Sequence, residues 1–221
     1  MKCESAQPHL GRQTVPADAA PRARAAPTVT VFLLLLLVRA ESSASQSVGT
    51  QPEARDSRPE SLERFAAGVK EWSLVSGFSR ERRGKKESVS QTRLEFGSYF
   101  RDRWSFRQQY VGSAHHAGDE ASGAAGANVG LRYHVMTWQR GSLFVEAYAG
   151  ALFGTRGWPE DGTNLNFTYL GNLGGTYALR PELHLVGAGG FQHYSNGFIW
   201  GRSRNPGSNQ YGGYVGLMFT F

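Results

Sequence analysis

Strict alternation of apolar and polar residues in the C-terminal part of the chain restricts its fold. Between residues 182 and 195, Leu185 and Phe191 lie at odd positions, and His184 and Gln192 lie at even positions. Side chains two residues apart leave the same face of a strand, so this stretch has one apolar and one polar face. The final segment repeats the pattern, and no window after residue 63 keeps a helical period. The sequence therefore predicts an all-β fold.

Eight segments carry this alternation. They lie near residues 64–79, 88–100, 103–112, 127–138, 142–153, 164–178, 182–195 and 209–221. The 28 glycines and the many aromatic residues suit short strands and tight turns. Eight antiparallel strands can close a barrel that leaves no unpaired edge. We therefore expect residues 63–221 to form an eight-stranded antiparallel transmembrane β-barrel.

The N-terminal region has the pattern of an export signal. Residues 29–38 are a run of ten that is apolar except for Thr30, preceded by arginines and followed by the small residues of 42–45. This run is too short to span a hydrocarbon core of about 30 Å as a helix. We expect a signal peptide over residues 1–44 and a flexible polar lead-in over residues 45–62, which are rich in Ser, Pro and Glu.

The links between the predicted strands differ in length. Four links are long, at residues 80–87, 113–126, 154–163 and 196–208, and they alternate with tight turns. Short turns on one side and long loops on the other are typical of outer-membrane barrels. A soluble, lipocalin-like barrel that binds a small hydrophobe is the alternative, since it is also exported and alternating.

Charge and cysteine content narrow the function classes. The formal net charge is +6, and it falls to +4 once the five basic and three acidic residues of the predicted signal peptide are removed. This bias suits an anionic membrane surface and is too small to indicate a nucleic-acid partner. The single cysteine, Cys3, excludes an internal disulfide and a cysteine zinc cluster. The basic residues of the first long link could meet phosphate groups or be simply solvated: Arg80, Arg82, Arg83, Lys85 and Lys86.

One pair of residues suggests catalysis. His193 and Ser195 are two residues apart in a predicted strand, so both leave the same face, as a general base and its nucleophile require. Their odd positions place them on the apolar, lipid-facing side of the barrel. Asn209 has the same parity on the last strand and could orient the imidazole, although no carboxylate is available on that face. The alternative is a structural histidine beside an uninvolved serine.

The residues around this pair resemble a known family. His193 to Gly197, then Asn205 to Asn209 and a final aromatic strand, are similar to the C-terminal signature of the lipid A 3-O-deacylases of the PagL type. The resemblance implies an outer-membrane serine esterase with His193 as base, Ser195 as nucleophile, and Asn196, Gly197 and Asn205 near the oxyanion hole. Asn209 stands where the family has a glutamate.

The resemblance also implies the partners. These are lipid A or lipopolysaccharide and the outer membrane, with a homodimer as a further arrangement, and no cofactor or metal is expected. A catalytically silent barrel with a structural or adhesive role is the competing function, favoured by Asn209. Two adjacent histidines, His115 and His116, could suggest a metal but are more often an accident of the surface. By parity, five charged residues face the lumen and should pair there: Arg93, Glu95, Arg107, Arg132 and Glu146.

Overall fold

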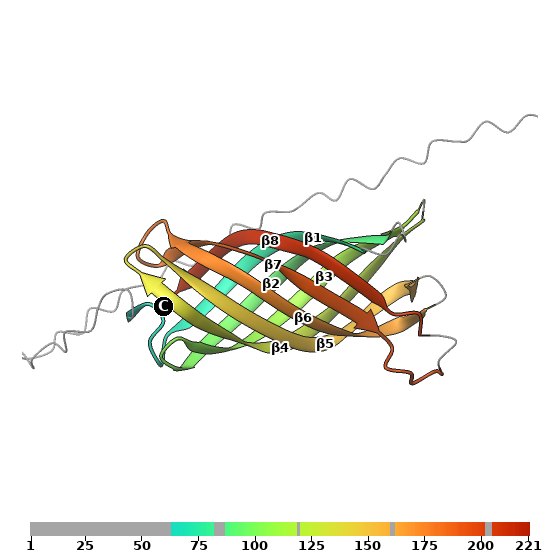
Figure 1. Cartoon of the computed structure of the whole chain (residues 1–221), viewed down its shortest axis with the longest axis horizontal. Helices are drawn as coiled ribbons and strands as arrows, with labels where there is room; N and C mark the ends of the chain where they lie inside the picture. The colour runs from blue at the N-terminus through green and yellow to red at the C-terminus, as the bar shows by residue number, and fades with distance from the viewer. Residues whose placement is uncertain (1–62, 82–86, 119, 160–161, 202–204) are drawn as a thin grey trace, which may run out of the picture. The chain divides into compact units, whose positions relative to one another are not determined.

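The computed structural model contains eight antiparallel strands (Figure 1). It describes residues 63–81, 87–118, 120–159, 162–201 and 205–221. The predicted signal peptide (1–44) and polar lead-in (45–62) lie outside these residues. The strands are β1 (Lys70–Glu81), β2 (Glu87–Arg101), β3 (Trp104–Ala117), β4 (Glu120–Trp138), β5 (Gly141–Trp158), β6 (Thr163–Ala178), β7 (Leu183–Ser195) and β8 (Ser208–Thr220).

The sheet closes on itself in sequence order. Each strand pairs with the next, and β1 pairs with β8 in a register that places Trp72 opposite Phe219 and Glu81 opposite Gln210. Since the first and last strands satisfy each other's backbone groups, the sheet has no unpaired edge. The predicted eight-stranded antiparallel barrel is confirmed. Among the described residues, no helix has the length and apolar character needed to cross a membrane.

The alternation sorts side chains as expected for a barrel in lipid. Large apolar side chains point outward and stay exposed around the whole circumference, among them Leu74, Leu94, Phe106, Val129, Leu143, Leu173, Leu185 and Leu217. Many charged and amide side chains, such as Arg93, Gln109 and Glu146, point inward and are buried. A soluble lipocalin-like barrel has the opposite arrangement, with its apolar face inside. The outward apolar surface therefore favours the membrane-spanning alternative.

The lumen is filled by a network of buried charges. Three arginines and four glutamates are buried there, at most 5% exposed: Glu71, Glu87, Arg93, Glu95, Arg107, Arg132 and Glu146. Arg107 pairs with Glu71 and lies 2.7 Å from Glu95, and Arg132 lies 2.7 Å from Glu146. The five predicted inward charges are confirmed, and Glu71 and Glu87 join them. Opposite charges at these distances offset part of the cost of burying each charge.

The end of the barrel that carries the C-terminus is covered by the segment before β1. The first strand begins at Lys70, so the predicted start near residue 64 is wrong. Phe65 instead turns into the lumen, is 1% exposed and stacks on His134 with ring centroids 4.0 Å apart. Gly68, at φ +92°, makes the turn that leads from this segment into the strand. The apolar Phe65 thus closes the lumen at this end.

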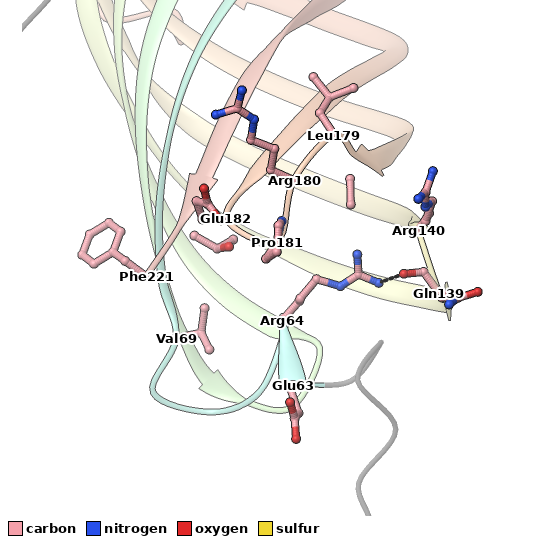
Figure 2. A pocket seen from close by; sticks show the side chains of 12 residues that line it. Glu63, Arg64, Val69, Gln139, Arg140, Leu179, Arg180, Pro181, Glu182 and Phe221 are labelled. Atoms are coloured by element: carbon pink, nitrogen blue, oxygen red, sulfur yellow. Dashed lines mark hydrogen bonds between the residues drawn. The ribbon is translucent and has the colours of Figure 1, made fainter. Parts of the chain in front are cut away.

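A pocket of about 580 Å³ lies at the same end, between residues of this segment and the strand turns (Figure 2). Arg64 crosses it and donates from Nη2 to the carbonyl oxygens of Trp138 and Gln139, at 3.0 and 2.5 Å. Charges of both signs line it, from Glu63, Arg64, Arg140, Arg180 and Glu182. The pocket therefore belongs to the packing of the C-terminal end, and His193 and Ser195 lie at the opposite end.

Two of the predicted long links are shorter than expected. Residues 113–126 are mostly strand, because β3 runs to Ala117 and β4 begins at Glu120, its partner. The Gly- and Ala-rich composition of this stretch hides the alternation, although backbone pairing does not depend on side chains. In the third link, Gly154 to Trp158 belong to β5. The first link lies largely outside the described residues. The fourth, between β7 and β8, contains no strand in its described part.

Candidate functional site

His193 and Ser195 lie on the outward face of β7, at the end of the barrel opposite the C-terminus. In this strand Gln192 and Tyr194 are buried in the lumen, whereas Leu185, with the same parity as His193, is 43% exposed. His193 is half-buried on the outer side. His193 is therefore on the lipid-facing side, as its parity in the sequence predicts, and Ser195 shares this parity but is buried.

Neighbouring strands surround the His193 ring. The register places Tyr169 of β6 on one side of His193 and Asn209 of β8 on the other. The Nδ1 atom of His193 lies 2.7 Å from Oδ1 of Asn209. Because an amide oxygen can only accept, Nδ1 carries the proton and donates it to Asn209. The neutral ring then has its lone pair on Nε2, which is the arrangement a general base needs.

Ser195 is the last residue of β7. It pairs with Phe167 of β6 and is 8% exposed. Among the described residues, the structure shows no hydrogen bond between the Ser195 hydroxyl and His193. Such bonds are often long or misaligned in unliganded enzymes and tighten when substrate binds. The structure thus brings His193 to Asn209 and leaves Ser195 beside them on the same face.

The residues after Ser195 are tied together by Asn196. Its backbone N–H donates to Oδ1 of Asn205 at 2.8 Å, and its own Oδ1 accepts from the N–H of Phe198 at 3.0 Å. Because Oδ1 of Asn205 is used in this way, its Nδ2 is the group that can donate to a ligand. The backbone N–H of Asn196 is already occupied, so it is a poor candidate for an oxyanion donor.

Two glycines shape the loop around the pair. Gly197 has φ +62°, and a Cβ on it would lie 3.2 Å from the Phe167 ring. Gly207 has φ +60°, and a Cβ on it would lie 3.7 Å from Cε1 of His193. Both positions require a left-handed backbone that glycine adopts without strain. Gly207 and Tyr169 were not singled out as site residues from the sequence, and the strand register is the signal that could have found them.

Tyr194, between His193 and Ser195, anchors the motif from the lumen side. Its hydroxyl donates to Oε1 of Gln192 at 2.6 Å, and its ring packs edge-on against Trp158 with centroids 4.8 Å apart. His115 contacts the same aromatic pair and bonds Ser113 at 2.8 Å. These contacts hold the inner side of β7 in place, so the outer pair is presented by a packed strand.

The adjacent histidines do not act together. His115 is buried in the lumen and His116 is exposed on the other face of β3. The surface interpretation of this pair is therefore wrong for His115. In the described part of the chain, no three His, Cys, Asp or Glu side chains come close enough to hold a metal ion.

Comparisons with known proteins identify both a family and similar folds. A family model for lipid A 3-O-deacylase (PagL) matches residues 85–218. No curated protein matches the chain. Among solved structures, outer membrane protein OprG from Pseudomonas aeruginosa is 14% identical, with 72% of this chain and 99% of that chain covered and a TM-score of 0.46.

Two other small barrels are similar in the same way. Neisserial surface protein A is 13% identical, with 69% of this chain and 94% of that chain covered and a TM-score of 0.47. Outer membrane protein W of E. coli is 11% identical, with 71% and 99% covered and a TM-score of 0.46.

Proposed function

Because the chain belongs to the lipid A 3-O-deacylase (PagL) family, we propose that it is a serine esterase that removes the acyl chain ester-linked at position 3 of lipid A. The protein is an outer-membrane β-barrel. The family match spans both β7 and most of β8, and so includes His193, Ser195 and Asn209. Lipid A or lipopolysaccharide is then its substrate, and the membrane is its immediate partner.

The hydrogen bond from His193 to Asn209 is the observation that carries this proposal. It selects the tautomer in which Nε2 can accept a proton, on the face that also carries Ser195. A histidine held in this way by a third residue is the arrangement expected for nucleophilic catalysis. A structural histidine needs no such free Nε2 at the lipid-facing surface.

In the proposed reaction, Nε2 of His193 takes the proton of the Ser195 hydroxyl, and Oγ attacks the ester carbonyl carbon. The carbonyl oxygen becomes an oxyanion, which Nδ2 of Asn205 and the backbone N–H of Gly197 stabilise. The tetrahedral intermediate collapses, and the oxygen at position 3 leaves with the proton held by His193. Water, deprotonated by His193, then attacks the acyl-enzyme, the bond to Oγ of Ser195 breaks, and His193 returns the proton to Oγ as the fatty acid is released.

Asn209 fixes the ring without charge. The family's glutamate would stabilise the imidazolium that forms during proton transfer, whereas the amide of Asn209 contributes only a neutral hydrogen bond. We therefore expect the His193–Ser195 pair to work more slowly than it would beside a carboxylate.

The position of the pair suits a lipid substrate. His193 is half-buried and Ser195 is 8% exposed on the outward side of the barrel, near exposed Tyr169 and Tyr211, and not in the packed lumen. A lipid A molecule can reach this surface within the membrane plane, with its acyl chains in the hydrocarbon layer. The ester at the base of the sugar then meets the barrel near the end opposite the C-terminus, where His193 and Ser195 lie.

The test is hydrolysis by the purified protein. We expect incubation with lipopolysaccharide to release a 3-hydroxy fatty acid, and Ser195→Ala to abolish the release. Ser98→Ala is a matched control, because Ser98 is exposed on β2 near the C-terminal end. Equal release by the parent and by Ser195→Ala would exclude Ser195 as the nucleophile.

A catalytically silent barrel is the second candidate. Two observations favour it, namely an amide at Asn209 in place of an acid and the absence, within the described residues, of a bond between His193 and Ser195. The same assay separates the two functions, since a silent barrel releases no fatty acid while still migrating as a folded, heat-modifiable barrel.

A further inference from the structure

Three large apolar side chains follow the candidate site and are exposed together. Phe198 is 59% exposed, Ile199 is 60% exposed and Trp200 is 44% exposed. They belong to the link between β7 and β8, outside any strand. Contiguous exposed apolar residues are unusual in an aqueous loop and mark interaction surfaces. We refer to residues 198–200 as the apolar turn.

Both ends of this link lie against the lipid-facing side of the barrel. At the start, Gly197 lies so close to the outward ring of Phe167 that a Cβ there would be 3.2 Å from it. At the end, Gly207 lies over the outward His193 ring, and a Cβ on this glycine would be 3.7 Å from Cε1 of His193. The apolar turn is therefore a continuation of the surface that carries exposed Tyr169 and Tyr211, which are 54% and 50% exposed.

The turn is held in its exposed conformation by Asn196. The side-chain oxygen of Asn196 accepts from the N–H of Phe198 at 3.0 Å, and its carbonyl accepts from the N–H of Ile199 at 3.2 Å. Phe198 has φ +63°, which is strained for a bulky residue. Asn196 is itself 1% exposed and directly follows Ser195. A strained turn that displays apolar side chains, fixed to the residue beside the nucleophile, indicates a functional role for the display.

We propose that the apolar turn docks into the acyl-chain layer of the outer leaflet beside Ser195. Docking would fix the candidate site at the depth where the ester of lipid A lies. Outer-leaflet acyl chains are the occupant because the turn is continuous with the apolar, lipid-facing surface that includes exposed Tyr169 and Tyr211. Aromatic and aliphatic side chains at this boundary gain from partial burial in the membrane. Only the kinetic consequence rests on the proposed function.

Insertion can be measured without catalysis. The only cysteine of the chain, Cys3, lies in the predicted signal peptide, so Ile199→Cys can be labelled alone with an environment-sensitive fluorophore, and Cys3→Ser keeps the labelling specific in any unprocessed chain. In phosphatidylcholine vesicles whose acyl chains carry a nitroxide, we expect strong quenching and a blue-shifted emission. Glu120→Cys is the control, because the Glu120 side chain is 81% exposed next to an outer hairpin and should remain unquenched.

The kinetic test uses Ile199→Ser, with folding checked by heat-modifiable migration. We expect KM for lipopolysaccharide in bilayers to rise about tenfold and kcat to change less than about twofold, because only membrane docking is weakened. Glu120→Ser should change neither constant.

Three results would overturn the proposal. The first is a label at residue 199 that behaves like the one at residue 120. The second is a blue shift that depends on the ratio of protein to lipid and is not quenched by nitroxide, which would place a second copy of the chain on the turn. The third is an equal fall in kcat and kcat/KM, with KM unchanged, which would mean that the turn supports the catalytic residues. If no hydrolysis occurs at all, quenching still decides whether the turn is in lipid.

Discussion

The replacement Asn209→Asp should make the protein a faster esterase. The substitution keeps the shape of the side chain and the acceptor that lies 2.7 Å from Nδ1 of His193, and it changes a neutral acceptor into a carboxylate. The carboxylate stabilises the imidazolium that forms when Ser195 is deprotonated. The transition state gains from this charge more than the neutral ground state does.

The size of the effect follows from the exposure of residue 209. A neutral hydrogen bond contributes about 1 kcal/mol and one to a charged group about 1.5–3 kcal/mol. Because Asn209 is exposed, the lower part of that range applies, and the difference between the two kinds of hydrogen bond is about 0.5–1 kcal/mol. This corresponds to an increase of about two- to fivefold in kcat.

The assay is the release of 3-hydroxy fatty acid from lipopolysaccharide in mixed micelles, followed over a range of pH. Asn209→Ala should instead lower kcat about tenfold, because the ring loses the acceptor that selects its tautomer.

A different outcome would refute the role of Asn209. If Asp and Ala at this position both leave the rate and the pH profile as in the parent, residue 209 does not orient His193. An Asp variant that is slower than the parent would show that the imidazolium is not on the reaction path.

Three further predictions concern the oxyanion donor and the barrel. We expect kcat to fall about 100-fold in single-turnover assays for both Asn205→Ala and Asn205→Asp. The aspartate keeps the acceptor oxygen but lacks the Nδ2 donor, so full activity of Asn205→Asp would contradict the role of that donor. Arg132→Met should destabilise the barrel by about 3–5 kcal/mol in urea titrations, because Glu146 loses its buried partner, and adding Glu146→Gln should recover part of the loss. Phe65→Ala should lower stability by about 3 kcal/mol in the same titrations, and no change would mean that the segment before β1 does not close the lumen.

The barrel was predictable because its environment imposes a period of two. Lipid outside and packed polar groups inside make each strand alternate, so the eight strands and the inward position of Arg93 or Arg132 follow from parity. The prediction failed where apolar and polar side chains do not alternate along a strand. The stretch of residues 113–126 is rich in Gly and Ala, and its hairpin is paired through the backbone. The segment around Phe65 contains too few residues for its turn into the lumen to show as a pattern.

For the candidate site, the sequence predicted only the face of the sheet on which each side chain lies. Parity places His193, Ser195 and Asn209 on one side of the sheet, and the register then brings Asn209 opposite His193. The hydrogen bond between them, and the orientation of the Ser195 hydroxyl, depend on side-chain rotamers that no spacing encodes. The resemblance already named Asn205, but its contact with Asn196 needed the structure, because the backbone N–H of Asn196 donates to Oδ1 of Asn205 across a loop.

The most direct test of the proposal that this barrel is a serine esterase is to measure the mass of lipid A from cells that express the protein. Lipid A from cells expressing the parent should lack one hydroxyacyl chain, and lipid A from cells with an equal amount of folded Ser195→Ala should keep it. Loss of the chain in both strains would contradict the assignment of Ser195, and retention of the chain in both would contradict the deacylase function.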